Sequence, residues 1–586
     1  MNHHLIPGPT YLTHPTRQAA LATQGFAAAM LLALSAAGFL AAPGARAADG
    51  PPPDAGSLLR ELPPPPPATA PARKPGLRVA PGPDGKLPDS APFEVRKLQI
   101  SGHTRFDTAT LHALVAEAEG QRLTLRQLDA FVGRITAFYR QAGYPLAQAL
   151  IPAQTVSEGV LRIEVIEARF GTVSVDNRSR VATPLLQDTL GALRPGEVVT
   201  QAVLERSLLL LSDLPGVDTA SLLRPGEAVG SSDLVVRVEP GAGFSGRLTA
   251  DSHGNRYTGN ARLSADLNLY NPLGRGDVLS VFALSSGARM KDGRLSYEAP
   301  LNGRGTRLSG SVSTLSYHLG DSAADLQAHG LARVGSLVLS HPLVRSEAFN
   351  LRAMAQIERT TLRDHVDSTG IRNDRHVGLA TLGLSGDRTD GGARGGVSGW
   401  SLGATRGRVG FDDTAAELAD AGSAATQGSF TRWNLFALHY QPLRPGTLLV
   451  LSLSAQRANG NLDSSQRFSL GGPTRVRAYQ GGSQSGDSGQ RVSLELRQAV
   501  AALPGASPAA GQWQAVVFID SGHVRISQRP WSAGPNGATL QGAGLGLNWA
   551  GPDAWNLRTS VAHPIGSTPE GIDRATHAWV ELVRGF

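Results

Sequence analysis

The sequence predicts a transmembrane β-barrel of about 16 antiparallel strands, preceded by two small α+β domains. From residue 242 to residue 586 there is almost no helical periodicity, and segments of about 8–10 residues alternate strictly between apolar and polar side chains. The polar faces of successive segments carry charges, as expected for strands that line a water-filled lumen. The chain also has 69 glycines among 586 residues, which favours turns and small strand residues over helical bundles.

The composition excludes several classes of protein. With no cysteine, the chain has no disulfide scaffold, thiol nucleophile or cysteine-based metal site. The net charge of +7 is spread along the chain without a basic block, so nucleic acid is not an expected partner. The histidines lack metal-ligand spacing, and the glycine-rich runs lack the strand–loop–helix context that binds phosphate. We therefore expect no cofactor and no bound metal.

The N-terminal segment, 1–47, reads as a secretory signal peptide. Residues 25–42 are apolar and uncharged, and Ala45-Arg46-Ala47 follows them with the small-x-small pattern of a cleavage site. A membrane anchor is the alternative, because 18 apolar residues are near the lower limit for a spanning helix. The cleavage pattern favours export.

Residues 48–92 form a proline-rich linker. They hold 14 of the 38 prolines, including five in succession at 63–67, which is typical of an extended spacer. A short helix at 57–62 is compatible with the sequence and would be a candidate plug for the barrel.

A first α+β domain is expected at 93–168. Its pattern gives a strand at 95–100, a helix capped by Asp107, and a second helix that opens with a capping box at Thr124. The second helix places Leu125, Leu128, Val132, Ile135 and Tyr139 on one face. Two strands follow, at 147–151 and 160–167.

A second domain, 169–241, repeats this order. A strand at 170–176 and a helix at 184–193 precede a second helix, which Thr200 is expected to cap, and strands at 217–223 and 234–239 close the unit. Two consecutive copies of this order resemble POTRA domains, the periplasmic modules that precede certain outer-membrane barrels.

The region 242–586 supplies the barrel strands. Clear alternation occurs at 262–270, 351–358 and 491–498, and the last strand ends in Phe586, which resembles the end signal of bacterial outer-membrane barrels. A soluble β-sandwich would also alternate. The charged inner faces and the alternation of short and long connections favour the barrel, and 14 to 18 strands fit the length at about 21 residues each.

Several motifs follow one another in this region. They are Asn271–Asp277, Phe468–Tyr479, Gly486–Gly489, Ser493–Arg497 and Val517–Gly522. This ordered set resembles the two-partner secretion transporters of the ShlB/FhaC/HecB haemolysin secretion/activation family. The resemblance implies an outer-membrane transporter whose N-terminal domains lie in the periplasm.

The resemblance also implies the site residues. In the family a long sixth loop folds back into the barrel, and its tip arginine pairs with an aspartate of the inner wall; by motif these are Arg477 and Asp520. The alternation of side chains along the strand supports the assignment of Asp520, because Asp520 lies on the polar face and Val517 and Ile519 lie on the opposite, apolar face. The loop-tip motif is Val476, Arg477, Ala478 and Tyr479, with alanine where the family has glycine, and the supporting residues are Gly471, Gly472, Asp487, Glu495 and Phe518.

The resemblance implies partners as well. They are a secreted exoprotein with an N-terminal secretion domain, of haemolysin, adhesin or haem-binding type, outer-membrane lipid, and the barrel assembly machinery that inserts the protein. We expect it to act as a monomer.

Three alternatives remain at this point. An outer-membrane assembly factor shares the sixth-loop motif but usually has more POTRA repeats, and a passive porin would not need such repeats. A protease resting on Ser488 is disfavoured, because a catalytic triad needs a histidine and an oriented acid nearby. We therefore do not expect an enzyme.

Overall fold

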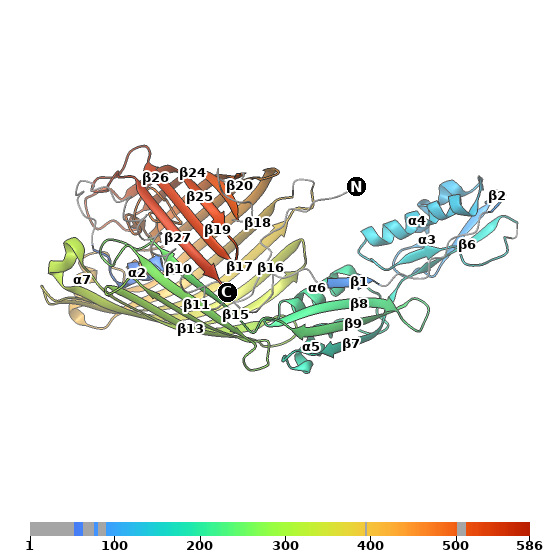
Figure 1. The fold of residues 1–586 in the computed structure, drawn as a ribbon, viewed down its shortest axis with the longest axis horizontal. Coiled ribbons are helices and arrows are strands. Elements are labelled where there is room, and N and C mark those ends of the chain that lie inside the picture. Colours follow the sequence, from blue (N-terminus) through green and yellow to red (C-terminus); the bar gives the residue numbers. More distant parts are fainter. Residues whose placement is uncertain (1–51, 63–75, 80–89, 157, 393–394, 501–510) are drawn as a thin grey trace.

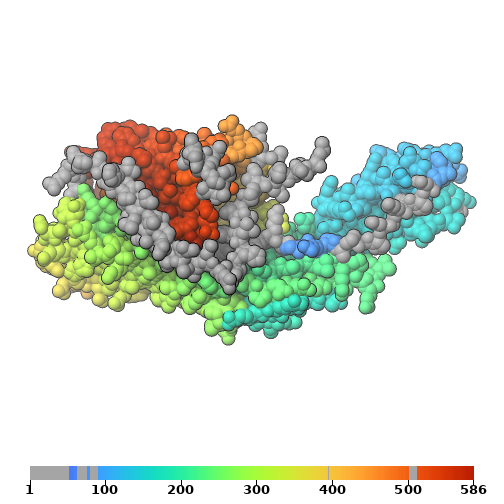
Figure 2. Space-filling view, in the orientation of Figure 1, coloured from blue at the N-terminus to red at the C-terminus, as the bar shows by residue number. Residues whose placement is uncertain are grey.

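The computed structural model describes residues 52–62, 76–79, 90–156, 158–392, 395–500 and 511–586. The predicted signal peptide and most of the proline-rich linker lie outside these ranges. The molecule is elongated. The barrel forms one end, and the two α+β units follow one another toward the opposite end (Figures 1 and 2). Within the described ranges no helix is long and apolar enough to cross a membrane.

The barrel is closed and contains 16 strands, as the sequence predicts. Each strand pairs antiparallel with its neighbours in chain order, and β10 pairs with β27 to close the cylinder. The strands are β10 (Phe244–Asp251), β11 (Arg262–Tyr270), β12 (Val278–Ser285), β13 (Met290–Pro300), β14 (Arg307–His318), β15 (Ala328–Arg345), β16 (Phe349–Val366), β17 (Ile371–Thr389), β18 (Val397–Phe411), β19 (Gly428–Arg444), β20 (Thr447–Ala458), β23 (Ser488–Val500), β24 (Gln512–Arg525), β25 (Gly537–Ala550), β26 (Trp555–Pro564) and β27 (His577–Gly585). Short elements in the connections are η2 (Asp321–Leu326), α7 (Thr414–Ala421) and η3 (Ser464–Gln466).

The two faces of the barrel wall follow the alternation of the sequence. On β24, Val517 and Ile519 are about half exposed on the outside, whereas Asp520 is fully buried on the inside. The terminal Phe586 belongs to the closing seam, because its carbonyl accepts a hydrogen bond from the Gly246 amide at 2.8 Å. The outward Arg584 lies over the ring of Trp555, 5.0 Å from its centroid, which accounts for a charge on this face.

The first α+β unit contains β2 (Phe93–Glu94), β3 (Lys97–Ser101), α3 (Thr108–Ala113), η1 (Ala116–Ala118), β4 (Arg122–Leu123), α4 (Leu125–Gln141), β5 (Gln148–Leu150) and β6 (Val160–Ile166). Asp107 accepts from the Thr110 amide, and Thr124 and Gln127 form the predicted capping box. Of the predicted apolar face of α4, Leu128, Val132, Ile135 and Tyr139 are fully buried against the sheet β3-β6-β5, whereas Leu125, in the first turn, is partly exposed.

Glu167 ties this unit together just after β6. Its carboxylate accepts hydrogen bonds from the Thr104 amide (2.8 Å), the Arg105 amide (2.9 Å), the Tyr139 hydroxyl (2.8 Å) and the Thr104 hydroxyl. Burial acts to raise the pKa of Glu167, but these donors outweigh it and hold the pKa below its ordinary value.

Glu167→Leu is therefore expected to destabilise the first unit by about 1–3 kcal/mol, because buried donors lose their acceptor. Since the folded-state pKa is lowered, the wild-type contribution is complete above the ordinary value of 4.5 and is lost as the pH falls through the folded-state pKa. Hydrogen-exchange protection of residues 102–106 measures this loss of stability in the first unit. Glu117→Gln, which removes an exposed carboxylate, is the control, and equal protection in both variants would contradict the account.

The second α+β unit contains β7 (Arg169–Asn177), α5 (Thr183–Leu190), α6 (Gln201–Ser212), β8 (Val217–Pro225) and β9 (Ser231–Pro240). Thr200 is the N-cap residue of α6, as predicted, but its side chain makes no capping hydrogen bond. The unit contacts the barrel directly, because both Nε and Nη2 of Arg345 donate to Asp213 at 2.8 Å. This contact identifies the short-turn end of the barrel as the end that carries the α+β units (Figure 1).

A linker strand, β1 (Gly76–Val79), extends the sheet of the second unit, giving the order β1-β8-β9-β7. It pairs parallel with Ala220–Leu223 of β8, and all four of its residues are exposed. The sequence does not predict this strand, because it lies within the proline-rich segment and depends on β8 for its hydrogen bonds.

Candidate functional site

A helix occupies the barrel lumen. This plug helix, α2 (Ala55–Glu61), lies inside the cylinder in Figure 1, far from the α+β units. It begins two residues before the expected 57–62, because Asp54 forms a capping box with Ser57: the Asp54 carboxylate accepts from the Ser57 amide at 2.8 Å, and the Ser57 hydroxyl accepts from the Asp54 amide at 2.9 Å. Its Ala55 and Leu58 are buried in an apolar cluster of lumen-facing side chains.

Arg375 holds the N-terminus of the plug helix to the barrel wall. Its guanidinium group, 3% exposed, contacts the carboxylates of Asp54 (2.7 Å), Asp364 (2.6 Å) and Asp463 (2.5 Å). Asp364 also accepts a hydrogen bond from the Ala55 amide at 2.8 Å. A helix N-terminus favours a nearby anion, so this cluster stabilises the plug helix through both its cap residue and its backbone. The sequence gives no sign of it, because its members are far apart in the chain.

The C-terminus of the plug helix contacts the sixth loop, which connects β20 to β23 (459–487). Arg475 donates to the Arg60 carbonyl at 2.7 Å, and Arg60 donates to the Arg467 carbonyl at 2.9 Å. Glu61 accepts from the Asn255 amide group at 3.1 Å. The plug helix and the sixth loop therefore hold each other inside the lumen.

The base of the sixth loop is a small hairpin of β21 (Phe468–Ser469) and β22 (Ser485–Gly486). Asp487 fixes its end by accepting from the amides of Leu462 (3.1 Å) and Gln528 (2.8 Å). Gly471 and Gly472 allow the chain to turn toward the tip: a Cβ on Gly471 would lie 2.0 Å from the Gln480 carbonyl oxygen, and Gly472 has a φ of +127°. Asp487, Gly471 and Gly472 therefore shape the loop, whereas the supporting residues Glu495 and Phe518 contact Arg477 itself.

Arg477, at the tip of the sixth loop, meets the inner wall. Its Nε and Nη2 donate to the two carboxylate oxygens of Asp520 at 2.8 and 2.7 Å, and its Nη1 donates to Glu495 at 2.6 Å. Nη2 also donates to the Ser493 hydroxyl at 3.0 Å, and the guanidinium carbon lies 3.4 Å from the centre of the Phe518 ring. Such a two-pronged, ring-stacked arginine has one defined position, which lysine would not reproduce.

The neighbours of Arg477 in the tip are also buried. Val476 packs beside Gly522, and the Tyr479 hydroxyl donates to the Gln541 carbonyl at 3.3 Å. Ala478 is accommodated because it faces Gly542 of β25, where a Cβ would lie only 2.4 Å from its methyl group. Gly542 thus offsets the alanine that stands where the family has glycine.

Two further residues bear on the site. The Trp579 indole donates to the Arg477 carbonyl at 2.8 Å, a contact that the sequence does not reveal because β27 is remote in the chain. Ser488 lies outside the tip, at the start of β23, where its hydroxyl accepts from the Ala458 amide at 3.0 Å and from the Gln528 side chain. The contacts of the Ser488 hydroxyl therefore hold the base of the sixth loop in place.

Comparison with known proteins identifies the family of the chain. The family model of the haemolysin secretion/activation protein ShlB/FhaC/HecB matches residues 230–549, and that of the ShlB-type POTRA domain matches residues 93–168. The chain belongs to the haemolysin secretion/activation family. As a member of this family it is an outer-membrane transporter of the two-partner secretion type, with its POTRA region in the periplasm.

Relatives of this family cover nearly the whole chain. The heme/hemopexin transporter protein HuxB of Haemophilus influenzae (strain 86-028NP) is 26% identical over 91% of this chain and 95% of its own length. The outer membrane transporter CdiB of Escherichia coli is 25% identical over 87% of this chain and 84% of its own. The solved structure of CdiB from Escherichia coli shares the fold, with a TM-score of 0.67 at 22% identity over 86% of this chain and 93% of that one.

Proposed function

We propose that this transporter secretes one large partner exoprotein, which passes unfolded through the barrel lumen after the plug helix and the sixth loop move. The proposal rests on how the lumen is filled. The plug helix and the sixth loop occupy it, and both are held only by noncovalent contacts to the wall and to each other, so both can move. The similarity to the heme/hemopexin transporter protein HuxB supports a haem-related or similar exoprotein as cargo. Folding of the cargo outside the cell would drive its export.

The edge of β8 that β1 occupies is the favoured place for the cargo to bind in the periplasm. The linker strand β1 already adds to this edge, so the edge accepts an extended peptide. Because β1 has only four residues, all exposed, a longer cargo segment with side-chain contacts can replace it.

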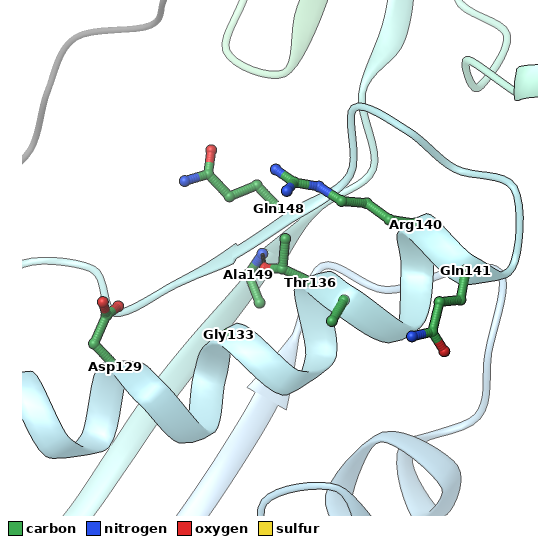
Figure 3. Close-up of a pocket in the computed structure, with 8 residues that line it drawn as sticks. Asp129, Gly133, Thr136, Arg140, Gln141, Gln148 and Ala149 are labelled. Atoms are coloured by element: carbon green, nitrogen blue, oxygen red, sulfur yellow. Dashed lines mark hydrogen bonds between the residues drawn. The ribbon is translucent and has the colours of Figure 1, made fainter. Parts of the chain in front are cut away.

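The edges of the first unit are less suitable. At β5 the Ala149 amide donates to the Thr136 hydroxyl at 3.0 Å, and at β3 the Leu98 amide donates to Glu119 at 2.8 Å, so both donors are already used. Figure 3 shows Thr136 beside Ala149 in the shallow polar groove between α4 and β5. An added strand there would have to displace these side chains first.

The linker connects cargo binding to the plug. Residues 62–75 join the plug helix to β1, so cargo that replaces β1 releases the chain segment that leads into the lumen. We infer that this release lowers the barrier to removal of the plug helix.

A double proline variant tests the docking edge. Leu77→Pro/Val79→Pro removes backbone donors and the pairing of β1, so the cargo's secretion domain should bind the detergent-solubilised full chain more tightly, by at least about threefold. Biolayer interferometry with the purified secretion domain measures the affinity. The matched control, Ala68→Pro/Ala70→Pro, adds prolines to the linker outside β1 and should leave affinity unchanged. Equal affinity for all three proteins would argue against β8 as the docking edge.

The remaining partners are proposed from the architecture. The apolar outer face of the barrel contacts outer-membrane lipid, and the barrel assembly machinery would insert the chain. We propose that a monomer suffices and that the protein has no catalytic activity; normal secretion by Ser488→Ala would remove the protease alternative.

A further inference from the structure

The outer face of β15–β18 changes character along the barrel axis. In the half nearer the α+β units, outward side chains are apolar, including Ile357, Leu382 and Leu402, which are 59%, 69% and 42% exposed. Toward the opposite, extracellular end the next outward positions on two of these strands are arginines: Arg359 follows Ile357 on β16, and Arg406 follows Ala404 on β18. The change marks the boundary between the hydrocarbon layer and the lipid headgroups.

A basic patch lies directly above this boundary. Its members are outward-facing, exposed arginines of four adjacent strands: Arg333, Arg359, Arg363, Arg372, Arg406 and Arg408. Among the described residues none of them forms a salt bridge; Arg406 donates to the Thr431 hydroxyl at 3.0 Å. Three carboxylates lie on the same face, and each contacts a histidine: Asp367 contacts His329 (3.6 Å), Asp374 contacts His365 (3.2 Å) and Asp412 contacts His376 (2.9 Å). The patch is therefore net positive, because its six arginines outnumber these three carboxylates.

A recess lies within the patch. In the strand register, Gly335, Arg359, Gly378 and Arg408 form one row across β15–β18. A Cβ placed on Gly335 or Gly378 would meet nothing within 4 Å, so there is open space on both sides of Arg359. Arg359 and Arg408 lie two strand spacings apart, about 9–10 Å between backbones, with Gly378 between them. Both guanidinium groups can reach an anion placed over Gly378.

We propose that this recess binds a phosphate group of the phosphorylated glycolipid in the outer leaflet of the outer membrane, with Arg359 and Arg408 as the direct ligands. Position and charge select this occupant: the apolar band beside the recess accommodates acyl chains, and phosphates of a lipid anchored there lie at the level of the arginines. Arginine matches phosphate by paired hydrogen bonds, and basic clusters at a membrane boundary recognise anionic headgroups. The site is independent of cargo export.

Binding of hexa-acylated bisphosphorylated lipid A to the detergent-solubilised full chain tests the proposal. Arg359→Gln/Arg408→Gln should weaken binding at least about tenfold, since two charge-assisted contacts are lost. Gly378→Leu should weaken it similarly by filling the recess while every charge is kept. The matched control is Arg457→Gln/Arg525→Gln, which removes two exposed outward arginines at the extracellular ends of β20 and β24 and should change binding less than twofold.

Several outcomes would overturn the proposal. One is binding of Arg359→Gln/Arg408→Gln within twofold of the wild type, or an equal loss in the control. Another is equal binding of lipid A stripped of its phosphates, which would mean that the acyl chains alone are recognised. Competition by millimolar inorganic phosphate as strong as that by lipid A would indicate a free-anion site. Heat-modifiable gel mobility verifies that each variant contains a folded barrel.

Discussion

Arg477→Ala is expected to reduce secretion of the partner exoprotein at least about tenfold while the barrel stays inserted in the outer membrane. The substitution removes the four side-chain hydrogen bonds to Asp520, Glu495 and Ser493 that hold the tip of the sixth loop. Each charge-assisted hydrogen bond contributes about 1.5–3 kcal/mol, and about 1.4 kcal/mol changes a population tenfold, so the loop loses its single resting position. The closed 16-strand wall does not depend on it.

The measurement is the amount of exoprotein in the culture medium, with heat-modifiable mobility as the check on folding. Arg477→Lys should be nearly as defective, because an ammonium group cannot bond both oxygens of Asp520 in one plane. Ser488→Ala is the matched loop-base control and should secrete normally. Wild-type secretion by Arg477→Ala would refute the role given to the loop tip.

The second large effect concerns the plug. Arg375→Gln should raise the open probability of the purified protein in planar bilayers at least about tenfold. Without the guanidinium group, the carboxylates of Asp54, Asp364 and Asp463 are left close together and unpaired in a buried site, which costs several kcal/mol. The electrostatic repulsion among these carboxylates decreases when the plug helix, which carries Asp54, leaves the lumen.

A steric variant tests the same helix without changing charge. A Cβ on Gly56 would lie 2.3 Å from the Ser464 hydroxyl oxygen and 2.7 Å from the Ser465 backbone nitrogen, so Gly56→Leu should also open the pore. Arg352→Gln, on the inner face of β16 near its periplasmic end, is the control and should conduct like the wild type. A closed pore in both Arg375→Gln and Gly56→Leu would contradict the account of the plug.

Period-two alternation made the barrel predictable from the sequence. It correctly assigned Asp520 to the lumen and Ile519 to the lipid face, because successive side chains of a strand point to opposite faces of the sheet. The caps at Asp107 and Thr124 were predictable for a similar reason: the donor and acceptor lie three residues apart, so no tertiary contact is needed.

The features that depend on distant contacts were not predictable. The plug helix has seven residues, too few to be stable alone, and it owes its start to Asp54, whose partner Arg375 is 321 residues away. The strand β1 exists only through its pairing with β8, and Trp579, on the last strand β27, reaches Arg477 102 residues away in the chain. No local pattern in the sequence encodes these contacts.

The path of the cargo is the central claim, and photo-cross-linking during secretion tests it most directly. Gln356 and Ile357 are consecutive on β16, but Gln356 faces the lumen and Ile357 faces the lipid. A benzophenone amino acid at position 356 should cross-link to the exoprotein in transit, and the same group at position 357 should not. Cross-links of equal yield at both positions, or at neither while secretion proceeds, would contradict passage through the barrel.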